Sequence, residues 1–372
     1  MKVTFTEAKG WNAVYKGGQL NNIIKSANAS PSLPLEEKVV SELRDILGFY
    51  VEANEDSHLA AHYKTVAPYA DTRLKLLKET IKLGATQYLL PTEYLEYRLY
   101  NRTPKEQREY VSGLKLQDIW RKHNKKDFLY LRNKEFANNR IRIFLGEEYA
   151  TQDFIINNNE GITKEQLISM RPFFAKPVDG LGGDGTFLIH KYSRLQDRFV
   201  GPLGGFYYEE LKKKMNGTPY LISKIVKSNF KPWIAKKSRG LNTIRFLTLR
   251  GNVIGATYKV CRYGNIADNF AKYGNLIVGI NLDSGQLMRT AYQGEDYRAE
   301  HDVELKHRET IPDWNNLIKF VEKAADIFKP SKLIGFDVAT TDNGPVIIDV
   351  NGTPGIRLHQ IPYQKGFKTL LK

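Results

Sequence analysis

The chain has 372 residues, ample for two or three hydrophobic cores and too long for one ordinary small domain. Hydrophobic residues make up 41% of the sequence, which excludes an intrinsically disordered chain, and a single cysteine, Cys261, excludes an intramolecular disulfide and a cysteine-based zinc site. Lysine and arginine outnumber acidic residues by 56 to 41; the formal charge of +15 favours an anionic partner, although a basic surface also serves solubility.

The N-terminal part is predicted to be helical. Apolar residues recur every three or four positions in 36–53 and in 71–85, and Gly84 is expected to cap the C-terminal end of the second helix. In "NRTPKEQREYV", Thr103 is expected to cap a helix that begins with proline, with Gln107 near the capping-box position. No stretch approaches eighteen apolar residues and no signal-peptide pattern is present, so we expect a cytoplasmic protein without a transmembrane segment.

Beyond residue 173 the pattern changes to strands and turns. The strand candidates are "FFAKPVDG", "GTFLIH", "YLISKIV", "TIRFLTLRGNVIGATYKV" and "NLIVGINLDSGQL", in which "LRGN" and "LDSG" are tight-turn signals. A last helix, "WNNLIKFVEKAADIF", follows them. We therefore expect a mainly helical region over 1–130, followed by an α+β region over 131–372.

A glycine-rich segment, "AKPVDGLGGDGTF", lies between two of these strands. Such glycines let backbone N–H groups approach phosphate oxygens. The segment is neither a Walker A loop, since no Gly-Lys-Ser/Thr follows, nor a dinucleotide fingerprint, since a strand follows instead of a helix. A flexible hairpin is the alternative interpretation. Lys176, just before the loop, could bring an ammonium group to the same phosphates, which favours a nucleotide site.

The segment "LIGFDVATTDNGPVIIDVNGTPG", residues 333–355, predicts a hairpin that carries acids. Two apolar runs flank an Asn-Gly turn signal and should pair in antiparallel fashion. Asp349 and Asn351 are two residues apart and leave the same face, so they can meet Asp337 at one end of the hairpin. Such oxygen ligands suit Mg²⁺. The alternative is a hairpin acid with a turn-forming asparagine.

Together these motifs resemble the ATP-grasp ligases, most closely the ATP-grasp proteins of polysaccharide and sugar-transfer gene clusters, which are similar to glutamate ligases. The resemblance covers roughly residues 85–360 and is carried by "KPVDGLGGDG", "LNTIRFLTL", "ADNF" and the acidic hairpin. It implies an ATP-grasp fold, in which two α+β subdomains clasp ATP, preceded by the helical region. The ATP-binding subdomain would span about 131–226, and the Mg²⁺ and substrate subdomain about 227–372.

The resemblance also implies site residues. Asp337, Asp349 and Asn351 would hold Mg²⁺, although the family usually has glutamate at the second position. Arg245 would reach the γ-phosphate, or it is simply a strand-edge arginine. ATP would be bound by Lys134, which also suits a surface charge, and by Lys176, Gly182, Gly183, Gly185, Ser223, Lys224, Ile225 and Val226.

The substrate side would lie along "YKVCRYGNIADNFAKYG". Arg262 is the expected clamp for a substrate carboxylate and, with Arg245, a catalytic residue. Where glutamate ligases have two glycines, Gly274 is followed here by Asn275, which favours a different ligand. His359 is expected to be a structural histidine. Further substrate contacts are assigned to Lys259, Asp268, Asn269, Lys272 and Arg357.

The implied reaction is ATP-dependent: a carboxylate becomes an acyl-phosphate, and an amine then attacks to give an amide, ADP and phosphate. By the same resemblance, an amino acid or simple amine would be joined to a sugar carboxylate in capsular or O-antigen polysaccharide biosynthesis. An amino-acid or peptide ligase is the second interpretation. A non-catalytic binder of anionic polymers is the third, and the intact metal ligands argue against it. No specific nucleic-acid partner is expected, and the oligomeric state stays open.

Overall fold

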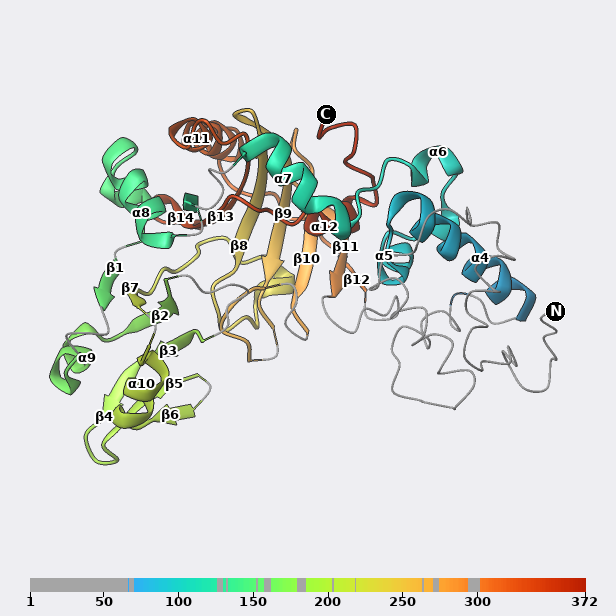
Figure 1. The fold of residues 1–372 in the computed structure, drawn as a ribbon. Coiled ribbons are helices and arrows are strands. Elements are labelled where there is room, and N and C mark those ends of the chain that lie inside the picture. The colour runs from blue at the N-terminus through green and yellow to red at the C-terminus, as the bar shows by residue number, and fades with distance from the viewer. Residues whose placement is uncertain are drawn as a thin grey trace. The chain divides into compact units, whose positions relative to one another are not determined.

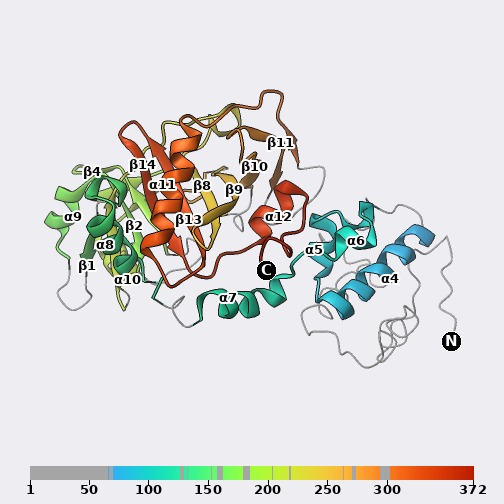
Figure 2. The same ribbon diagram turned by 90° about the horizontal axis from the view of Figure 1, so that it is seen from above.

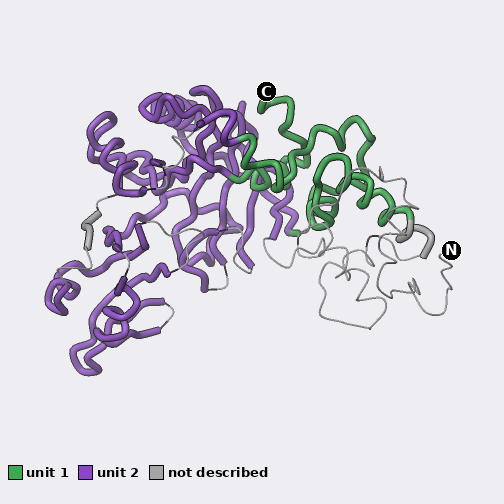
Figure 3. Tube along the Cα trace, viewed as in Figure 1, with its two compact units in different colours: residues 1–119, 296–302, 355–372 green, residues 120–295, 303–354 purple. Residues whose placement is uncertain are grey.

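The computed structural model (Figure 1) describes most of the chain beyond the first 65 residues. The described residues are 66, 70–125, 130–131, 133–151, 153–156, 162–178, 185–202, 204–217, 219–262, 264–269, 274–293 and 302–372. The chain divides into two compact units (Figure 3): unit 1 contains 1–119, 296–302 and 355–372, and unit 2 contains 120–295 and 303–354. The domain boundaries near residues 130 and 226 stay predictions.

Unit 1 is helical in its described part. Its elements are α4 (Ala70–Gln87), α5 (Pro91–Glu96), η2 (Leu99–Asn101), α6 (Pro104–Gln107), η3 (Gly113–Lys115) and, from the C-terminal segment, α12 (Arg357–Tyr363). The helix predicted over 36–53 lies outside the described residues. No helix in the described part of the chain is long and apolar enough to cross a membrane.

Two details of the helix prediction were wrong. Gly84 does not cap the helix, which continues to Gln87, and the left-handed residue after it is Tyr88, with φ 62°. Glycine costs about 1 kcal/mol within a helix, and burial of the neighbouring Leu83 and Ala85 offsets that cost. Thr103 does cap α6, but the reciprocal hydrogen bonds of its capping box come from Glu106 and not from the next residue.

Unit 2 begins within α7 (Leu116–Asn124), which spans the division at residue 119, and continues through α8 (Lys134–Phe144) and η5 (Glu147–Tyr149). A four-stranded antiparallel sheet then follows, with the order β1-β7-β2-β3. A small three-stranded sheet, β4-β5-β6, is built from the chain that follows β3. The elements are β1 (Asp153–Ile156), α9 (Lys164–Met170), β2 (Phe173–Pro177), β3 (Phe187–Ile189), β4 (Lys191–Ser193), β5 (Arg198–Gly201), β6 (Gly204–Phe206), α10 (Tyr208–Met215) and β7 (Tyr220–Lys224).

The rest of unit 2 is a seven-stranded sheet, β12-β11-β10-β9-β8-β13-β14, antiparallel throughout. The predicted acidic hairpin is confirmed as β13 and β14, and the "LRGN" signal is a two-residue turn with φ of 54° and 89° between β8 and β9. The elements are η6 (Trp233–Ala235), β8 (Thr243–Leu249), β9 (Asn252–Val260), β10 (Leu276–Ile280), β11 (Leu287–Gln293), β12 (Val303–Glu304), α11 (Trp314–Ile327), β13 (Leu333–Thr341) and β14 (Gly344–Asn351).

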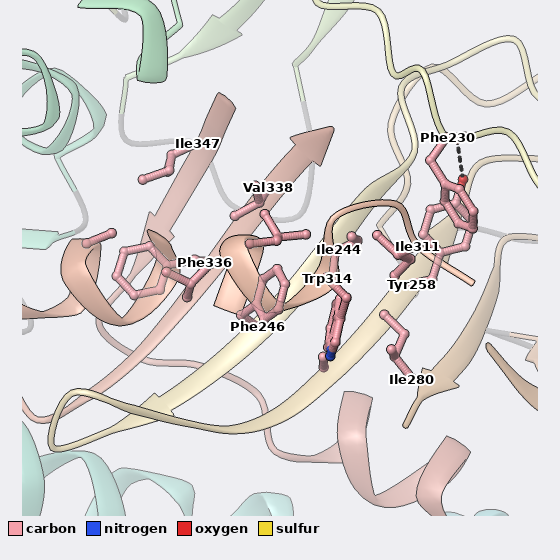
Figure 4. Packing of buried hydrophobic residues seen from close by; sticks show 14 of the residues in the cluster. Phe230, Ile244, Phe246, Tyr258, Ile280, Ile311, Trp314, Phe336, Val338 and Ile347 are labelled. Carbon is pink, nitrogen blue, oxygen red and sulfur yellow. Dashed lines mark hydrogen bonds between the residues drawn. The ribbon is translucent and has the colours of Figure 1, made fainter. Parts of the chain in front are cut away.

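Helix α11 covers one face of this large sheet (Figure 2). Alternate strand residues point towards it, and Phe246 stacks on Trp314 with ring centroids 5.6 Å apart (Figure 4). Phe336 and Val338 of β13 are fully buried in the same cluster. Because strand side chains alternate between faces, the residues between these ones belong to the opposite face of the sheet. That opposite face contains the candidate site.

Candidate functional site

Charged residues form a row across three neighbouring strands of the large sheet. Arg245 of β8 lies directly opposite Asp337 of β13, and Asp337 lies opposite Asp349 of β14. Arg245 and Asp337 are each flanked by residues of the hydrophobic core, and Asp349 is followed by the core residue Val350; since directly paired residues share a face, the three side chains lie on the face away from α11. The hairpin spacing thus brings both acids together, as predicted, and strand pairing adds a guanidinium beside them.

Arg245 and Asp337 form a buried, two-pronged ion pair. Arg245 Nε and Nη2 each donate to one oxygen of Asp337, both at 2.7 Å. Lys259 of β9 is also buried, and its Nζ lies 3.0 Å from Asp337 Oδ1. Burial alone would raise the pKa of Asp337, but the two cations hold the pKa of this carboxyl well below its ordinary value. Asp337 is therefore ionised in the folded protein.

Glycine at position 335 makes room for this arrangement. A Cβ atom there would lie 3.1 Å from Arg245 Nη1 and 3.0 Å from Pro354 Cβ, closer than most side chains tolerate. Gly335 lies two residues before Asp337 on the same strand face and pairs with Asn351 of β14. A side chain at this position would therefore push the guanidinium or Pro354 away by a few tenths of an ångström.

Asp268 connects this row to the loop that follows β9. Its Oδ1 accepts from Lys259 Nζ at 2.9 Å, and its Oδ2 accepts from the backbone N–H of Thr243 at 2.8 Å and from the Thr243 hydroxyl at 2.5 Å. Burial would lower the pKa of Lys259, but Asp268 and Asp337 raise it above its ordinary value. Lys259 is thus a buried cation shared by two carboxylates. The predicted contact between Lys259 and a substrate stays a prediction.

Asn275, which replaces the second glycine of the glutamate-ligase pattern, organises the same loop. Its side chain is fully buried. The side-chain oxygen accepts from Arg262 N and from Asn265 Nδ2, both at 2.9 Å. The side-chain nitrogen donates to the carbonyls of Ala267 and Asn269, at 2.9 and 2.7 Å. The asparagine therefore uses its hydrogen bonds to fold the loop.

A cleft of about 580 Å³ borders this row and is lined by both main sheets. Lys176 of β2 lies in its wall, is largely buried, and donates from Nζ to the Ile348 carbonyl of β14 at 3.1 Å. Thr243 and Asp268 line the cleft from the other side, which places the charged network at its edge. The predicted adenine-contacting residues also line it: Ser223, Lys224, Ile225 and Val226.

The predicted Mg²⁺ ligands have the donor chemistry for that ion. Two carboxylates directly opposite on adjacent strands repel each other unless a cation lies between or beside them. Arg245 and Lys259 compensate Asp337, whereas Asp349 makes no hydrogen bond or ion pair with another described residue. Asn351 Oδ1 accepts from Thr353 N and Oγ1, at 2.9 and 3.1 Å. The Asp349 carboxylate is thus available to a hard cation, and Asp337 and Asn351 supply further oxygen atoms on the same face of the hairpin.

A broader metal cluster is absent from the described part of the chain, where no three or more His, Cys, Asp or Glu side chains are grouped to hold an ion. The predicted set has only two carboxylates and completes its donors with an amide. Cys261 is buried, donates to the Asn265 carbonyl, and burial raises the pKa of its thiol to about 12. It is suited neither to metal binding nor to nucleophilic attack.

The remaining predicted residues lie at several places. Lys134 begins α8 and donates to the Val178 carbonyl at 3.1 Å, and Gly185 follows the loop with φ 73°. Arg357 belongs to α12 in unit 1, where its guanidinium pairs with the buried Glu96. His359 of the same helix is fully buried and stacks on Phe367, in line with a structural role. Gly182, Gly183 and Lys272 lie outside the described residues.

Two main antiparallel sheets with a shared cleft, an acidic hairpin and a buried lysine in the cleft wall define an ATP-grasp protein. The model of the sugar-transfer associated ATP-grasp family matches residues 151–372, more than half of the chain. The chain belongs to this family. A search of curated proteins finds no match.

The chain is also similar to several solved structures of ligases. D-alanine–D-alanine ligase from Bacillus anthracis, complexed with ATP, is 14% identical with a TM-score of 0.37, over 65% of this chain and 62% of that one. ATP-grasp ligase PsnB, complexed with a phosphomimetic precursor variant, Mg and ADP, is 12% identical with a TM-score of 0.37, over 64% and 56%. L-amino acid ligase from Bacillus licheniformis is 12% identical with a TM-score of 0.36, over 65% and 45%. The chain therefore spans less than two thirds of each of these ligases.

Proposed function

We propose that this protein is an ATP-dependent carboxylate–amine ligase that forms an amide through an acyl-phosphate. The observation that carries the proposal is the charged row Arg245–Asp337–Asp349 at the edge of a cleft whose wall contains Lys176. A phosphoryl-transfer site needs fixed cations for the phosphates and oxygen ligands for a metal ion, and this row supplies both.

The chain's own residues would mainly bind and orient the reactants. The purine would lie against 223–226, and Lys176 would contact the phosphates at the β14 side of the cleft. Arg245 would hold a γ-phosphate oxygen with a guanidinium already fixed by Asp337. Asp337, Asp349 and Asn351 would hold Mg²⁺, which would neutralise phosphate charge. Arg262, carried by the loop that Asn275 folds, would orient the substrate carboxylate.

The reaction balances without a covalent enzyme intermediate. A carboxylate oxygen attacks the γ-phosphorus of ATP, and the bond to the ADP oxygen breaks. The nitrogen of an amine then attacks the acyl carbon, inorganic phosphate leaves, and the amine loses a proton to solvent. Catalysis of this type depends on positioning and charge stabilisation. We propose that the acid is a sugar carboxylate, joined to an amino acid or amine in capsular or O-antigen polysaccharide biosynthesis; the association of the family with sugar transfer supports a sugar substrate.

The test is ADP release from the full chain with panels of uronic acids, both free and as nucleotide- and lipid-pyrophosphate-linked sugars, amino acids and simple amines, followed by mass spectrometry. We expect ADP only when an acid is present, and a product with the mass of acid plus amine minus water. A dipeptide product would instead identify an amino-acid ligase. ADP release that is independent of every acid, or no ADP with any panel member, would refute the ligase proposal.

A further inference from the structure

The segment after β7 lines the cleft with cations that the proposed chemistry of ATP does not use. Between residues 224 and 242 the sequence has six lysine or arginine residues and no acid. Lys224 lines the cleft but is already assigned to ATP, and three others, Lys227, Lys231 and Arg239, line it as well. We call these three residues the basic lip. All three are exposed, and none makes a hydrogen bond or ion pair with another residue that the structure describes.

The backbone that carries the basic lip is fixed, so its cations occupy defined places. Phe230, Ile234 and Ala235 lie in the core of unit 2 between the lip residues. The N–H of Asn229 donates to the Thr340 carbonyl at 2.9 Å, and the Ser238 hydroxyl lies 2.9 Å from Asn242 Oδ1. A segment anchored in this way orders its exposed side chains at lower entropic cost when a ligand binds.

The position of the basic lip indicates that its ligand is not the triphosphate of ATP. The lip follows directly on 223–226, where the purine is expected, and the purine carries no charge. The phosphates are assigned instead to Lys176 and Arg245. Among the described residues that line the cleft, Asp268 is the single acid, and Lys259 and Thr243 already compensate it. The lip therefore presents uncompensated positive charge to a second anion within the cleft.

We infer that the basic lip binds a pyrophosphate group on the sugar substrate, so that the acid or amine is presented on an activated, pyrophosphate-linked sugar and not as a free sugar. The inference rests on the proposed ligase function and names its substrate class. Lysine ammonium groups and the fork of an arginine match the adjacent phosphate oxygens of a pyrophosphate. A free uronate, with one carboxylate, would leave most of this charge unused. The pyrophosphate can come from a nucleotide or from a polyprenyl lipid, since both present the same group.

The test is isothermal titration calorimetry of the full chain, saturated with AMP-PNP and Mg²⁺. The probes are UDP-glucuronate for a nucleotide-linked sugar, farnesyl pyrophosphate for a lipid-linked one, and free glucuronate. We expect at least one pyrophosphate probe to bind about tenfold more tightly than glucuronate, and Lys231→Ala or Arg239→Ala to weaken it by about tenfold, the loss expected for one charge-assisted hydrogen bond. Preference between the two probes identifies the source of the pyrophosphate.

Lys236→Ala and Lys237→Ala are the matched controls, because both residues are exposed on the same segment but do not line the cleft. They remove the same charge and should change binding less than about twofold. Equal losses in lip and control variants, equal binding of all three probes, or displacement of AMP-PNP by the pyrophosphate probes would overturn the inference. Failure of AMP-PNP to bind would instead count against the ATP site. The basic lip would then be tested by titrating the same probes into the same variants without nucleotide.

Discussion

Replacing Lys259 by methionine tests whether the buried charges are held as the structure indicates. The ammonium group lies 2.9 Å from Asp268 and 3.0 Å from Asp337, and all three residues are buried. Removing one partner of a buried ion pair costs about 3–5 kcal/mol, because an uncompensated charge remains. Arg245 still pairs with Asp337, so we expect a loss of about 3 kcal/mol, at the lower end of that range.

This loss is measured as the free energy of unfolding in urea, followed by tryptophan fluorescence, since Trp314 lies in the core of unit 2. A loss of 3 kcal/mol corresponds to about 6–12 °C in melting temperature for a domain of this size. Lys237→Met is the control, because Lys237 is exposed and unpaired among the described residues. Adding Asp268→Asn to Lys259→Met should recover part of the loss, because the neutral amide needs no counter-charge.

The outcome that would refute this reasoning is a loss for Lys259→Met within about 1 kcal/mol of that for the control, the size of a surface effect. A loss of unfolding free energy in the double variant that exceeds the sum of the losses in the two single variants would also contradict it. Either result would mean that Asp268 and Asp337 are compensated by other groups. The charged row would then not be the preorganised element that the proposed mechanism needs.

Four further predictions concern the site and unit 1. Asp349→Asn should lower turnover by about 100-fold with the fold intact, whereas Asp342→Asn in the exposed hairpin turn should be near wild type, measured by ADP release and circular dichroism. Gly335→Ala should displace the Arg245 guanidinium and lower kcat by about 10–100-fold, and little change in kcat would contradict the assignment of Arg245. Asn275→Ala should raise KM for the acid more than KM for ATP, because it removes the hydrogen bonds that hold the loop with Arg262. Equal rises in both KM values would mean that this loop is not part of the acid pocket. Finally, unit 1 should lose stability as pH rises from 5 to 8, and Glu93→Gln should remove about half of that loss.

Local sequence signals predicted the acidic hairpin well. The two apolar runs and the turn between them are properties of neighbouring residues, but the register differs from that of an Asn-Gly turn. The two turn residues are Asp342 and Asn343, and a bulge at Ile348 shifts the pairing so that Asp337 lies opposite Asp349. The opposition of Arg245 and Asp337 could not be predicted in the same way. These two residues are 92 positions apart, and only the pairing of β8 with β13 brings them together. The sequence therefore indicated the oxygen ligands for a metal ion, but not that buried cations balance the charge of Asp337.

The roles of Asn275 and the basic lip were missed for related reasons. Asn275 was recognised as a departure from a glycine pair, but its bonds to four loop residues depend on how the loop folds back on itself. The lip did leave a signal, since 224–242 contains no acid. Burial of alternate residues along the segment decides which cations reach the cleft, and that depends on packing of Phe230 and Ile234 into the core.

The pH prediction for unit 1 follows from a carboxyl group that is buried without a salt bridge among the described residues. Glu93 is 2% exposed, and its carboxylate accepts from the backbone N–H groups of Leu90 at 2.9 Å and Gly113 at 2.6 Å. Burial raises the pKa of Glu93 to about 7, against the lowering effect of these two hydrogen bonds. Burial likewise raises the pKa of Asp302 to about 7, although Arg98 opposes that shift.

For an acid whose pKa is higher in the folded state than in the unfolded chain, the folded state binds more protons between the two values. Stability is therefore greatest below the unfolded pKa, near 4.5, and falls as pH rises towards about 7. The difference corresponds to about 3 kcal/mol for Glu93, and Asp302 adds a decrease of the same sign. Urea unfolding at pH 5, 6, 7 and 8, read by pulse-labelling hydrogen exchange in peptides covering 89–113 at one fixed pulse pH, measures it. Glu93→Gln should make this decrease smaller and leave only the part due to Asp302. Glu106→Gln, on the exposed surface, should leave the decrease unchanged. A wild-type profile that is flat or rises with pH would mean that Glu93 stays ionised in the folded protein, in which case the two backbone N–H groups outweigh its burial.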